Sequence, residues 1–202
     1  MTGKRETMAA LKWSLSALRS IGRIVRNGQL RLRGINVAWT ANVHSSAEIN
    51  CKRGTVSIGA CSSIDKGAIL RTYGGHIRIG SNSSINPYCV IYGHGGLTIG
   101  NGVRIAAHTV IIPANHNYLD SSIFVSAQGE TKQGITVEDD VWLGAGVRVL
   151  DGVTIAKGCV VGAGSVLTKS TVSYGVYVGV PARKIAARSS SATMNTILGQ
   201  KI

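Results

Sequence analysis

The sequence contains few residues of several kinds, and each shortage excludes a class of structure. Only one of its 202 residues is phenylalanine and three are proline, so we expect a core made of aliphatic side chains. No apolar run reaches the roughly 18 residues of a membrane-spanning helix, and we expect no signal peptide. Cys51, Cys61, Cys89 and Cys159 include no close-spaced pair, so neither a zinc site nor a redox pair is predicted. Cys89 and Cys159 are expected to be core thiols in a reducing cytoplasm.

Acidic residues are also scarce. Nine Asp and Glu stand against 22 Lys and Arg, which gives a formal net charge of +13, and no acid follows Asp151. Such a balance favours an anionic partner: nucleic acid, an acidic membrane surface or a phosphorylated small molecule. No nucleic-acid module or base-stacking series of aromatic residues is recognisable, so we expect no nucleic-acid partner.

The feature that is abundant is a six-residue repeat, accompanied by 26 glycines. In the second half of the chain an aliphatic residue recurs at every sixth position: Val137, Leu143, Val149, Ile155, Val161 and Leu167. Small or β-branched residues follow the first five of these by four positions: Val141, Val147, Val153, Cys159 and Ser165. A helix would need a period near 3.6 and a simple strand a period of two. A fixed period of six instead predicts a β-helix of stacked coils.

Earlier hexads come in groups of three, separated by short insertions at 73–75 and 93–96. Three hexads per group predict a triangular coil of about eighteen residues with three flat faces. The period is lost between Ile112 and Gly134. We therefore predict a loop arm over 113–134 that leaves a corner, reaches towards a neighbouring subunit and returns at Ile135.

The two ends of the chain differ from the repeat. Residues 1–34 form a predicted basic amphipathic helical segment, with Leu11, Leu15, Leu18, Ile21 and Val25 on one side. This segment would either attach to an anionic membrane surface, with Trp13 at the interface, or cap the open end of the β-helix or pack on a neighbouring subunit. The β-helix domain is predicted over 35–180, and a short helix with a Ser-rich tail over 181–202.

Three motifs accompany the hexads, namely 140–146 (DVWLGAG), 161–169 (VGAGSVLTK) and 178–183 (VGVPAR). Together, over roughly Ile49 to Arg188, they resemble the hexapeptide-repeat acyltransferases, and among these the maltose, galactoside and surface-polysaccharide O-acetyltransferases. The resemblance implies an all-β solenoid, a left-handed parallel β-helix, that assembles as a homotrimer. It also implies transfer of an acetyl group from acetyl-CoA to a hydroxyl of a saccharide acceptor, with no metal required. The positive charge would then serve the phosphates of CoA.

The reaction needs a base for the attacking hydroxyl, and a neutral imidazole suits that task. The resemblance assigns this role to His116, at the root of the arm. Asp120, Glu130 or a main-chain carbonyl would orient its second ring nitrogen, and spacing does not choose among them. We expect His44, His76 and His108 to be surface residues.

The resemblance also implies the binding residues. On the acceptor side these are Asn86, which as a corner residue would alternatively cap its own turn, and His94, where sugar acetyltransferases of this kind often carry Asp. On the donor side Trp142 would flank the pantetheine arm, while Gly144 and Ala145 leave room for it and offer a backbone N–H to the thioester oxygen. The CoA channel and the nucleotide phosphates would be met by Ala163, Thr168, Lys169 and Arg183. Ordinary packing of Trp142 and a solvated basic rim are the alternatives.

Other functions remain open. An antibiotic acetyltransferase would use the same base and donor site, whereas serine O-acetyltransferases carry a long helical N-terminal domain that this chain lacks. A zinc carbonic anhydrase of the same fold would need three well-placed histidines, for which His94, His108 and His116 are the candidates. With its basic N-terminus, the protein is predicted to act on a cell-surface polysaccharide or its precursor at the cytoplasmic face of the membrane.

Overall fold

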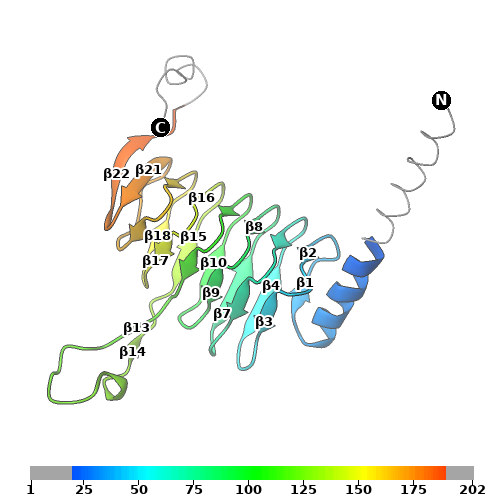
Figure 1. Ribbon diagram of the computed structural model, residues 1–202, viewed down its shortest axis with the longest axis horizontal. Helices are drawn as coiled ribbons and strands as arrows, with labels where there is room; N and C mark the ends of the chain where they lie inside the picture. The colour runs from blue at the N-terminus through cyan, green and yellow to red at the C-terminus, as the bar shows by residue number, and fades with distance from the viewer. Residues whose placement is uncertain (1–19, 190–202) are drawn as a thin grey trace.

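A computed structural model describes residues 20–189 as a three-sided parallel β-helix, with a helix at one end and a projecting arm towards the other (Figure 1). Successive strands of the chain lie on successive faces, so neighbours within a sheet are one coil apart in the sequence. The triangular coil predicted from the hexads is therefore confirmed.

Three sheets form the faces within residues 20–189, and all their strands are parallel except β22 (Ala182–Ala187). Sheet 1 consists of β1 (Asn36–Val37), β4 (Thr55–Ile58), β7 (His76–Ile79), β10 (Leu97–Ile99), β15 (Ile135–Val137) and β18 (Thr154–Ile155). Sheet 2 consists of β2 (Asn42–Val43), β5 (Ser63–Ile64), β8 (Ser84–Ile85), β11 (Arg104–Ile105), β16 (Trp142–Leu143), β19 (Val160–Val161), β21 (Gly175–Gly179) and β22 (Ala182–Ala187). Sheet 3 consists of β3 (Glu48–Asn50), β6 (Ile69–Arg71), β9 (Val90–Tyr92), β12 (Val110–Ile111), β17 (Arg148–Val149) and β20 (Val166–Leu167).

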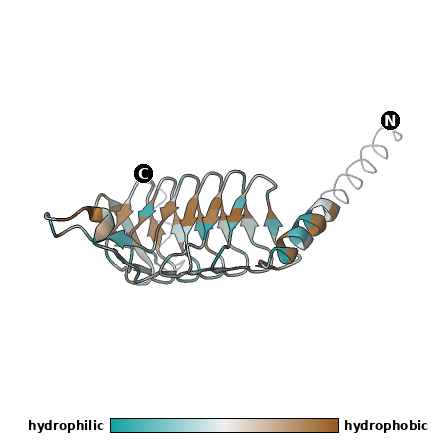
Figure 2. Cartoon of the chain, turned by 90° about the horizontal axis from the view of Figure 1, so that it is seen from below, coloured by the Kyte–Doolittle hydropathy of each residue, from teal (hydrophilic) through white to brown (hydrophobic). Residues whose placement is uncertain are grey.

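The core is a set of aliphatic columns inside the coils. Ile64, Ile85, Ile105 and Leu143 lie in register in sheet 2, and all four are fully buried. The residues of the predicted six-step series and their small companions are buried in the same way, and Figure 2 shows hydrophobic residues recurring in the strands of coil after coil. Cys89 and Cys159 are buried in these columns, as predicted, and burial raises the pKa of the Cys89 thiol to about 11.

The N-terminal helix, described over 20–32, closes the first coil. Asn27 is buried and its Nδ2 donates hydrogen bonds to the carbonyls of Ala38, Trp39 and Ala41 at 3.2, 3.3 and 2.8 Å. The carbonyl of Ala38 also accepts the N–H of Ala41, and Asn27 supplies further donors at an edge where no other coil follows. The described part of the helix is thus a cap, while the rest of the predicted amphipathic stripe lies outside the described residues.

Most apolar residues of the helix do not face the solenoid, and Leu30, which is buried in the core, is the exception. Ile21 and Val25 are 58% and 55% exposed, and only Asn27 and Leu30 of the helix are buried. An apolar stripe therefore remains on its outer side. Within residues 20–189 no helix is long and apolar enough to cross a membrane.

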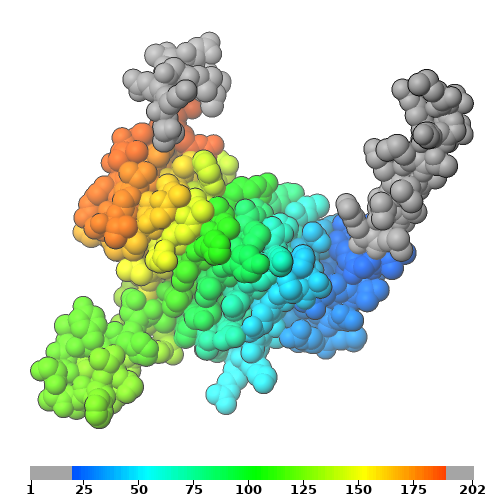
Figure 3. All heavy atoms as spheres, in the orientation of Figure 1, coloured from blue at the N-terminus to red at the C-terminus, as the bar shows by residue number. Residues whose placement is uncertain are grey.

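The arm leaves sheet 3 after β12, where the hexads were lost, and projects from the body (Figure 3). It is a hairpin of β13 (Asn115–His116) and β14 (Glu130–Thr131), with a 3₁₀ turn, η1 (Val125–Ala127), near its tip. Its returning chain is fixed by Asp151, whose carboxylate accepts hydrogen bonds from the backbone N–H groups of Gln133 and Gly134, all at 3.0 Å.

The prediction of a short C-terminal helix is wrong for the part of it that the structure describes. Residues 182–187 form β22, which pairs antiparallel with β21 through Val178 and Arg183 among others. This hairpin extends sheet 2 beyond the last coil, and pairing with the free edge of β21 outweighs the local helical preference of the segment. The Ser-rich tail from residue 190 lies outside the described residues.

The columns predict a strong contrast between two leucines. Leu70 lies on β6, between β3 and β9, and is fully buried. Leu32, on the helix, is 91% exposed. We expect Leu70→Ala to lower the free energy of unfolding by about 2–5 kcal/mol and Leu32→Ala to change it by less than about 0.5 kcal/mol. Urea denaturation followed by circular dichroism measures both, and equal losses would contradict the columnar core.

Candidate functional site

The predicted site residues lie at two different corners of the triangle. At the corner between sheets 2 and 3, the turn residues that follow sheet 2 stack from coil to coil: the N–H of Gly144 donates to the carbonyl of Val161, and the N–H of Gly162 to that of Tyr177. Six of the predicted residues belong to this corner or to the adjoining strands of sheet 2, namely Asn86, Trp142, Gly144, Ala145, Ala163 and Arg183.

The other four predicted residues lie at the corner between sheets 3 and 1. His94 follows β9, His116 lies in the arm strand that continues from β12, and Thr168 and Lys169 follow β20. One chain therefore brings together the predicted base and His94, but it does not bring them to the residues around Trp142.

A cavity of about 350 Å³ marks the corner between sheets 3 and 1. It is lined by Tyr73, Tyr92, His94, Ile112, Ala114, Asn115, His116 and Glu130. Both histidines predicted for this region thus face one hollow, together with a carboxylate and two phenol rings. A small polar molecule fits a hollow of this size and lining.

His116 faces Glu130 across the two strands of the arm. Its Nε2 lies 3.8 Å from Oε1 of Glu130, and the other carboxylate oxygen forms an ion pair with Nζ of Lys132 at 3.0 Å. The hydrogen bond and charge of Lys132 lower the pKa of Glu130, so the carboxylate is charged at neutral pH.

Asp120, the other carboxylate considered for His116, serves the arm itself. Its Oδ1 accepts hydrogen bonds from the N–H and the hydroxyl of Ser122 at 2.9 and 2.6 Å. Its backbone is held by the side chain of Gln128, which donates to its carbonyl at 2.7 Å. Of the two acids, Glu130 is the one placed next to His116.

His94 is part of an aromatic cluster. Its ring stacks on Tyr73, with centroids 4.3 Å apart and planes 11° apart, and Tyr73 meets the edge of Tyr92 at 4.8 Å. Burial lowers the pKa of His94, which favours its neutral form at neutral pH. Its Nδ1 is buried and forms no hydrogen bond within the described residues.

Tyr73 and Tyr92 were missed by sequence reasoning, although the register contains a signal for one of them. Leu70 pairs with Ile91, and counting three residues on from each puts Tyr73 directly one coil away from His94. Tyr73 was noted only as part of a corner insertion. Aligning the corner residues of successive hexads therefore predicts that Tyr73 and His94 are neighbours.

At the corner between sheets 2 and 3, the packing of the coils requires glycine at position 144 whether or not a ligand binds there. A Cβ placed on Gly144 would lie 2.6 Å from the backbone N of Ala163, so the close approach of the two coils already requires glycine there. Trp142 projects outwards from sheet 2 and is 54% exposed. Ala145 and Ala163 are exposed beside it.

The three candidate zinc ligands are not gathered at one place. His108 lies at the corner between sheets 2 and 3, where it stacks on Tyr88 at 5.5 Å, while His94 and His116 lie at the other corner. Within residues 20–189 no group of three His, Cys, Asp or Glu side chains is arranged to hold a metal ion.

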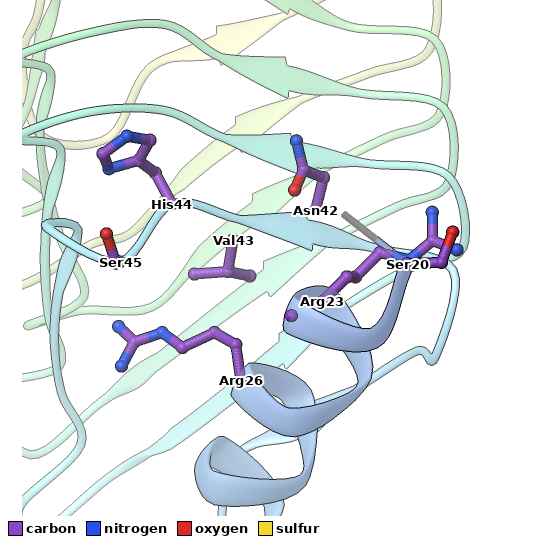
Figure 4. A pocket seen from close by; sticks show the side chains of 8 residues that line it. Ser20, Arg23, Arg26, Asn42, Val43, His44 and Ser45 are labelled. Atoms are coloured by element: carbon purple, nitrogen blue, oxygen red, sulfur yellow. The ribbon is translucent and has the colours of Figure 1, made fainter. Parts of the chain in front are cut away.

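A second large hollow lies between the N-terminal helix and the first coil (Figure 4). It measures about 630 Å³ and is lined by Ser20, Gly22, Arg23, Arg26, Asn42, Val43, His44 and Ser45. In Figure 4 the two arginines extend to opposite ends of the hollow, so they do not converge on one point. It contains none of the predicted site residues.

Comparison with known proteins relates this geometry to a family. Residues 134–169 match the model of the bacterial transferase hexapeptide repeat (six repeats). The chain is 30% identical to the galactoside O-acetyltransferase of Escherichia coli over 77% of each protein. It is 27% identical to a probable acetyltransferase of Mycobacterium tuberculosis over 92% of its own length, and it spans 64% of that relative.

Among solved structures, the N-acyltransferase AntD of Bacillus cereus is similar, with a TM-score of 0.72 and 26% identity over 84% of this chain and 92% of AntD. That structure contains coenzyme A and dTDP-4-amino-4,6-dideoxyglucose. Repeat, sequence and coil geometry agree: the chain belongs to the hexapeptide-repeat acyltransferase family.

Proposed function

We propose that the protein transfers an acetyl group from acetyl-CoA to a hydroxyl of a saccharide, with His116 as the general base. The observation that carries the proposal is the cavity of about 350 Å³ in which His116, Glu130 and His94 meet. The membership of the family and the sugar acyl transfer performed by its named relatives support it.

The chemistry requires one mobile proton. His116 removes the proton of the acceptor hydroxyl as that oxygen attacks the thioester carbonyl, the new C–O bond forms and the C–S bond breaks, and the imidazolium returns the proton to the leaving thiolate. The carboxylate of Glu130, 3.8 Å from Nε2, stabilises the imidazolium between these steps. A backbone N–H near Gly144 would hold the carbonyl oxygen as negative charge develops.

The acceptor is proposed to occupy the cavity against His94, Tyr73 and Tyr92. Aromatic faces accommodate the apolar face of a sugar ring, and His94 lines the same cavity. Asn86, at the other corner, would contribute from a neighbouring copy. Because AntD holds an amino sugar nucleotide, an amino group is the second candidate acceptor and belongs in the same test panel.

We infer that a homotrimer completes the site. Trp142, Ala145, Ala163 and Arg183 are proposed to bind acetyl-CoA, yet they lie at a different corner from His116 in the same chain. A neighbouring copy that sets its corner between sheets 2 and 3 against the arm would unite the two sets. The arm tip supports such a contact, because Tyr118, Leu119 and Phe124 are 72%, 89% and 85% exposed. Thr168 and Lys169, beyond the arm, would then line the donor channel from the base's side.

The N-terminal segment 1–34 is proposed to hold the enzyme at the anionic inner face of the cell membrane, where a surface polysaccharide precursor is made. The outward Ile21, Ile24 and Val25 of the described helix are exposed, and the helix and its following turn carry Arg23, Arg26, Arg31 and Arg33 with no carboxylate partner among residues 20–189. Apolar and basic residues together are typical of helices that lie in a membrane interface.

The role of His116 is tested by thiol release from acetyl-CoA. The acceptor panel contains free sugars, nucleotide-linked sugars and amino sugars, and the variants are His116→Ala and His44→Ala. Loss of a general base lowers kcat by about a hundredfold or more, whereas His44, an exposed residue whose imidazole bonds to Ser46, should be dispensable. Unchanged turnover in His116→Ala, with an acceptor that the wild type uses, would exclude this base.

The membrane role is tested by sedimentation with vesicles of anionic phospholipid. We expect the wild type to pellet with them and Ile21→Asp/Val25→Asp to pellet much less, because acidic residues would face both lipid tails and anionic headgroups. Ile185→Asp, which alters an equally exposed apolar residue far from the helix, is the control. If the double variant pellets like the wild type, the described helix is not the membrane contact.

A further inference from the structure

The outward residues of sheet 1 form one continuous polar row. Pairing in register joins Asn36 to Ser57, Ser57 to Arg78, Arg78 to Thr98, Thr98 to Thr136 and Thr136 to Thr154. Each coil thus contributes one hydrogen-bonding side chain, and none of the six is acidic or apolar.

On the other two faces no polar row runs through every coil. On sheet 2 the outward residues are polar in the first four coils, Asn42, Ser63, Ser84 and Arg104, and apolar in the next three, Trp142, Val160 and Val176. On sheet 3 they include Ile69, Val90, Val110 and Val166. A polar row that continues through all six coils is therefore a property of sheet 1 and not a general consequence of the repeat.

The hydroxyls of the row are spaced and unoccupied. Neighbouring strands lie about 4.8 Å apart, so Thr98, Thr136 and Thr154 present hydroxyl groups at a regular interval close to the length of one sugar ring. Within residues 20–189 these three hydroxyls have no side-chain hydrogen bond to the protein. Thr98, Thr136 and Thr154 also line a groove of about 410 Å³, together with His76, Arg78 and Gln133 among others.

The groove has a positive charge that no acid of the described chain neutralises. Nη1 of Arg78 lies 3.2 Å from Nε2 of His76, and Arg78 forms no ion pair within residues 20–189. Burial and the charge of Arg78 lower the pKa of His76, so the neutral imidazole accepts that hydrogen bond. The remaining guanidinium N–H groups point to an anionic group as the natural partner.

Two further features connect the groove with the cavity at His116. Gly95 and Gly96, which line the groove, directly follow His94, and Gln133 and Gly134 form the returning end of the arm. A Cβ on Gly96 would overlap the His76 imidazole, so the glycine lets that ring pack down beside the row. The groove and the acceptor cavity therefore lie on the two sides of the arm's root.

We infer that sheet 1 binds an extended anionic glycan, with Arg78 on a carboxylate and the threonine row on sugar hydroxyls. The inference rests on the proposed function, since it assigns to a polymeric acceptor a second binding surface beyond the cavity where transfer occurs. A nucleic acid fits less well, because the row has no aromatic residue for base stacking and only one cation for many phosphates.

The test measures binding without acetyl-CoA, by calorimetry on the full-length protein. The probes are a hyaluronan octasaccharide, its carboxyl-reduced neutral form and single-stranded DNA. We expect the wild type to bind the octasaccharide and to bind the neutral form about tenfold more weakly, as loss of a charge-assisted contact implies. Arg78→Gln and Thr98→Val/Thr136→Val should each weaken octasaccharide binding about tenfold.

Arg148→Gln is the matched control, because Arg148 is an exposed, outward arginine on sheet 3 and should leave binding unchanged. Three results would overturn the inference: no octasaccharide binding by the wild type, an equal loss in Arg148→Gln, or tighter binding of DNA. Thiol release with a small acceptor should survive in Arg78→Gln, so failure of the glycan surface and failure of the transferase proposal are distinguishable. Unchanged thermal denaturation of the variants excludes loss of fold.

Discussion

The hydrogen-bonded stacking of one coil on the next is the constraint on which the rest of this structure depends. Every face must present its backbone at one strand spacing from the coils on either side, and every inward position must accept an aliphatic or small side chain in the same column. Leu143 cannot be replaced by a polar residue, and Gly144 cannot gain a Cβ, without disturbing the coil above. Variation is therefore confined to outward side chains, corners and insertions.

The residues proposed to carry the reaction lie in these variable parts, on an insertion and at a corner. The arm is the one long insertion among the described coils, and it carries His116 and Glu130 on paired strands whose return is clamped by Asp151. The corner between sheets 2 and 3 has no comparable insertion and presents instead the exposed Ala145 and Ala163 beside Trp142. A rigid prism cannot fold these corners together, so a second copy is the natural way to join them.

The features that depend on burial could be predicted from the sequence, whereas those that depend on contacts between outward or terminal residues could not. The six-residue period predicted the three faces and the buried columns, because each inward position needs an aliphatic or small side chain in every coil. The loss of the period predicted the arm. The cluster of Tyr73 and Tyr92 with His94 was not predicted, because the six-residue period identifies inward positions, whereas Tyr92 ends a strand as an outward residue and Tyr73 lies in a corner insertion. Residues 182–187 were expected in a helix, and their pairing with β21 depends on an edge that local preference does not reveal. Asn27, a polar residue in a predicted amphipathic helix, proved to be the contact that caps the solenoid.

The central claim is that one chain supplies the base and its neighbour the donor groove. Its most direct test is complementation between His116→Ala and Ala163→Trp, a substitution that places a bulky ring at the exposed corner proposed to bind acetyl-CoA. The two inactive variants, unfolded and refolded together, should regain thiol release, because a mixed trimer contains one interface with both intact corners. If the mixture stays as inactive as each variant alone while mixed trimers are shown to form, the site lies within a single chain and the account is wrong.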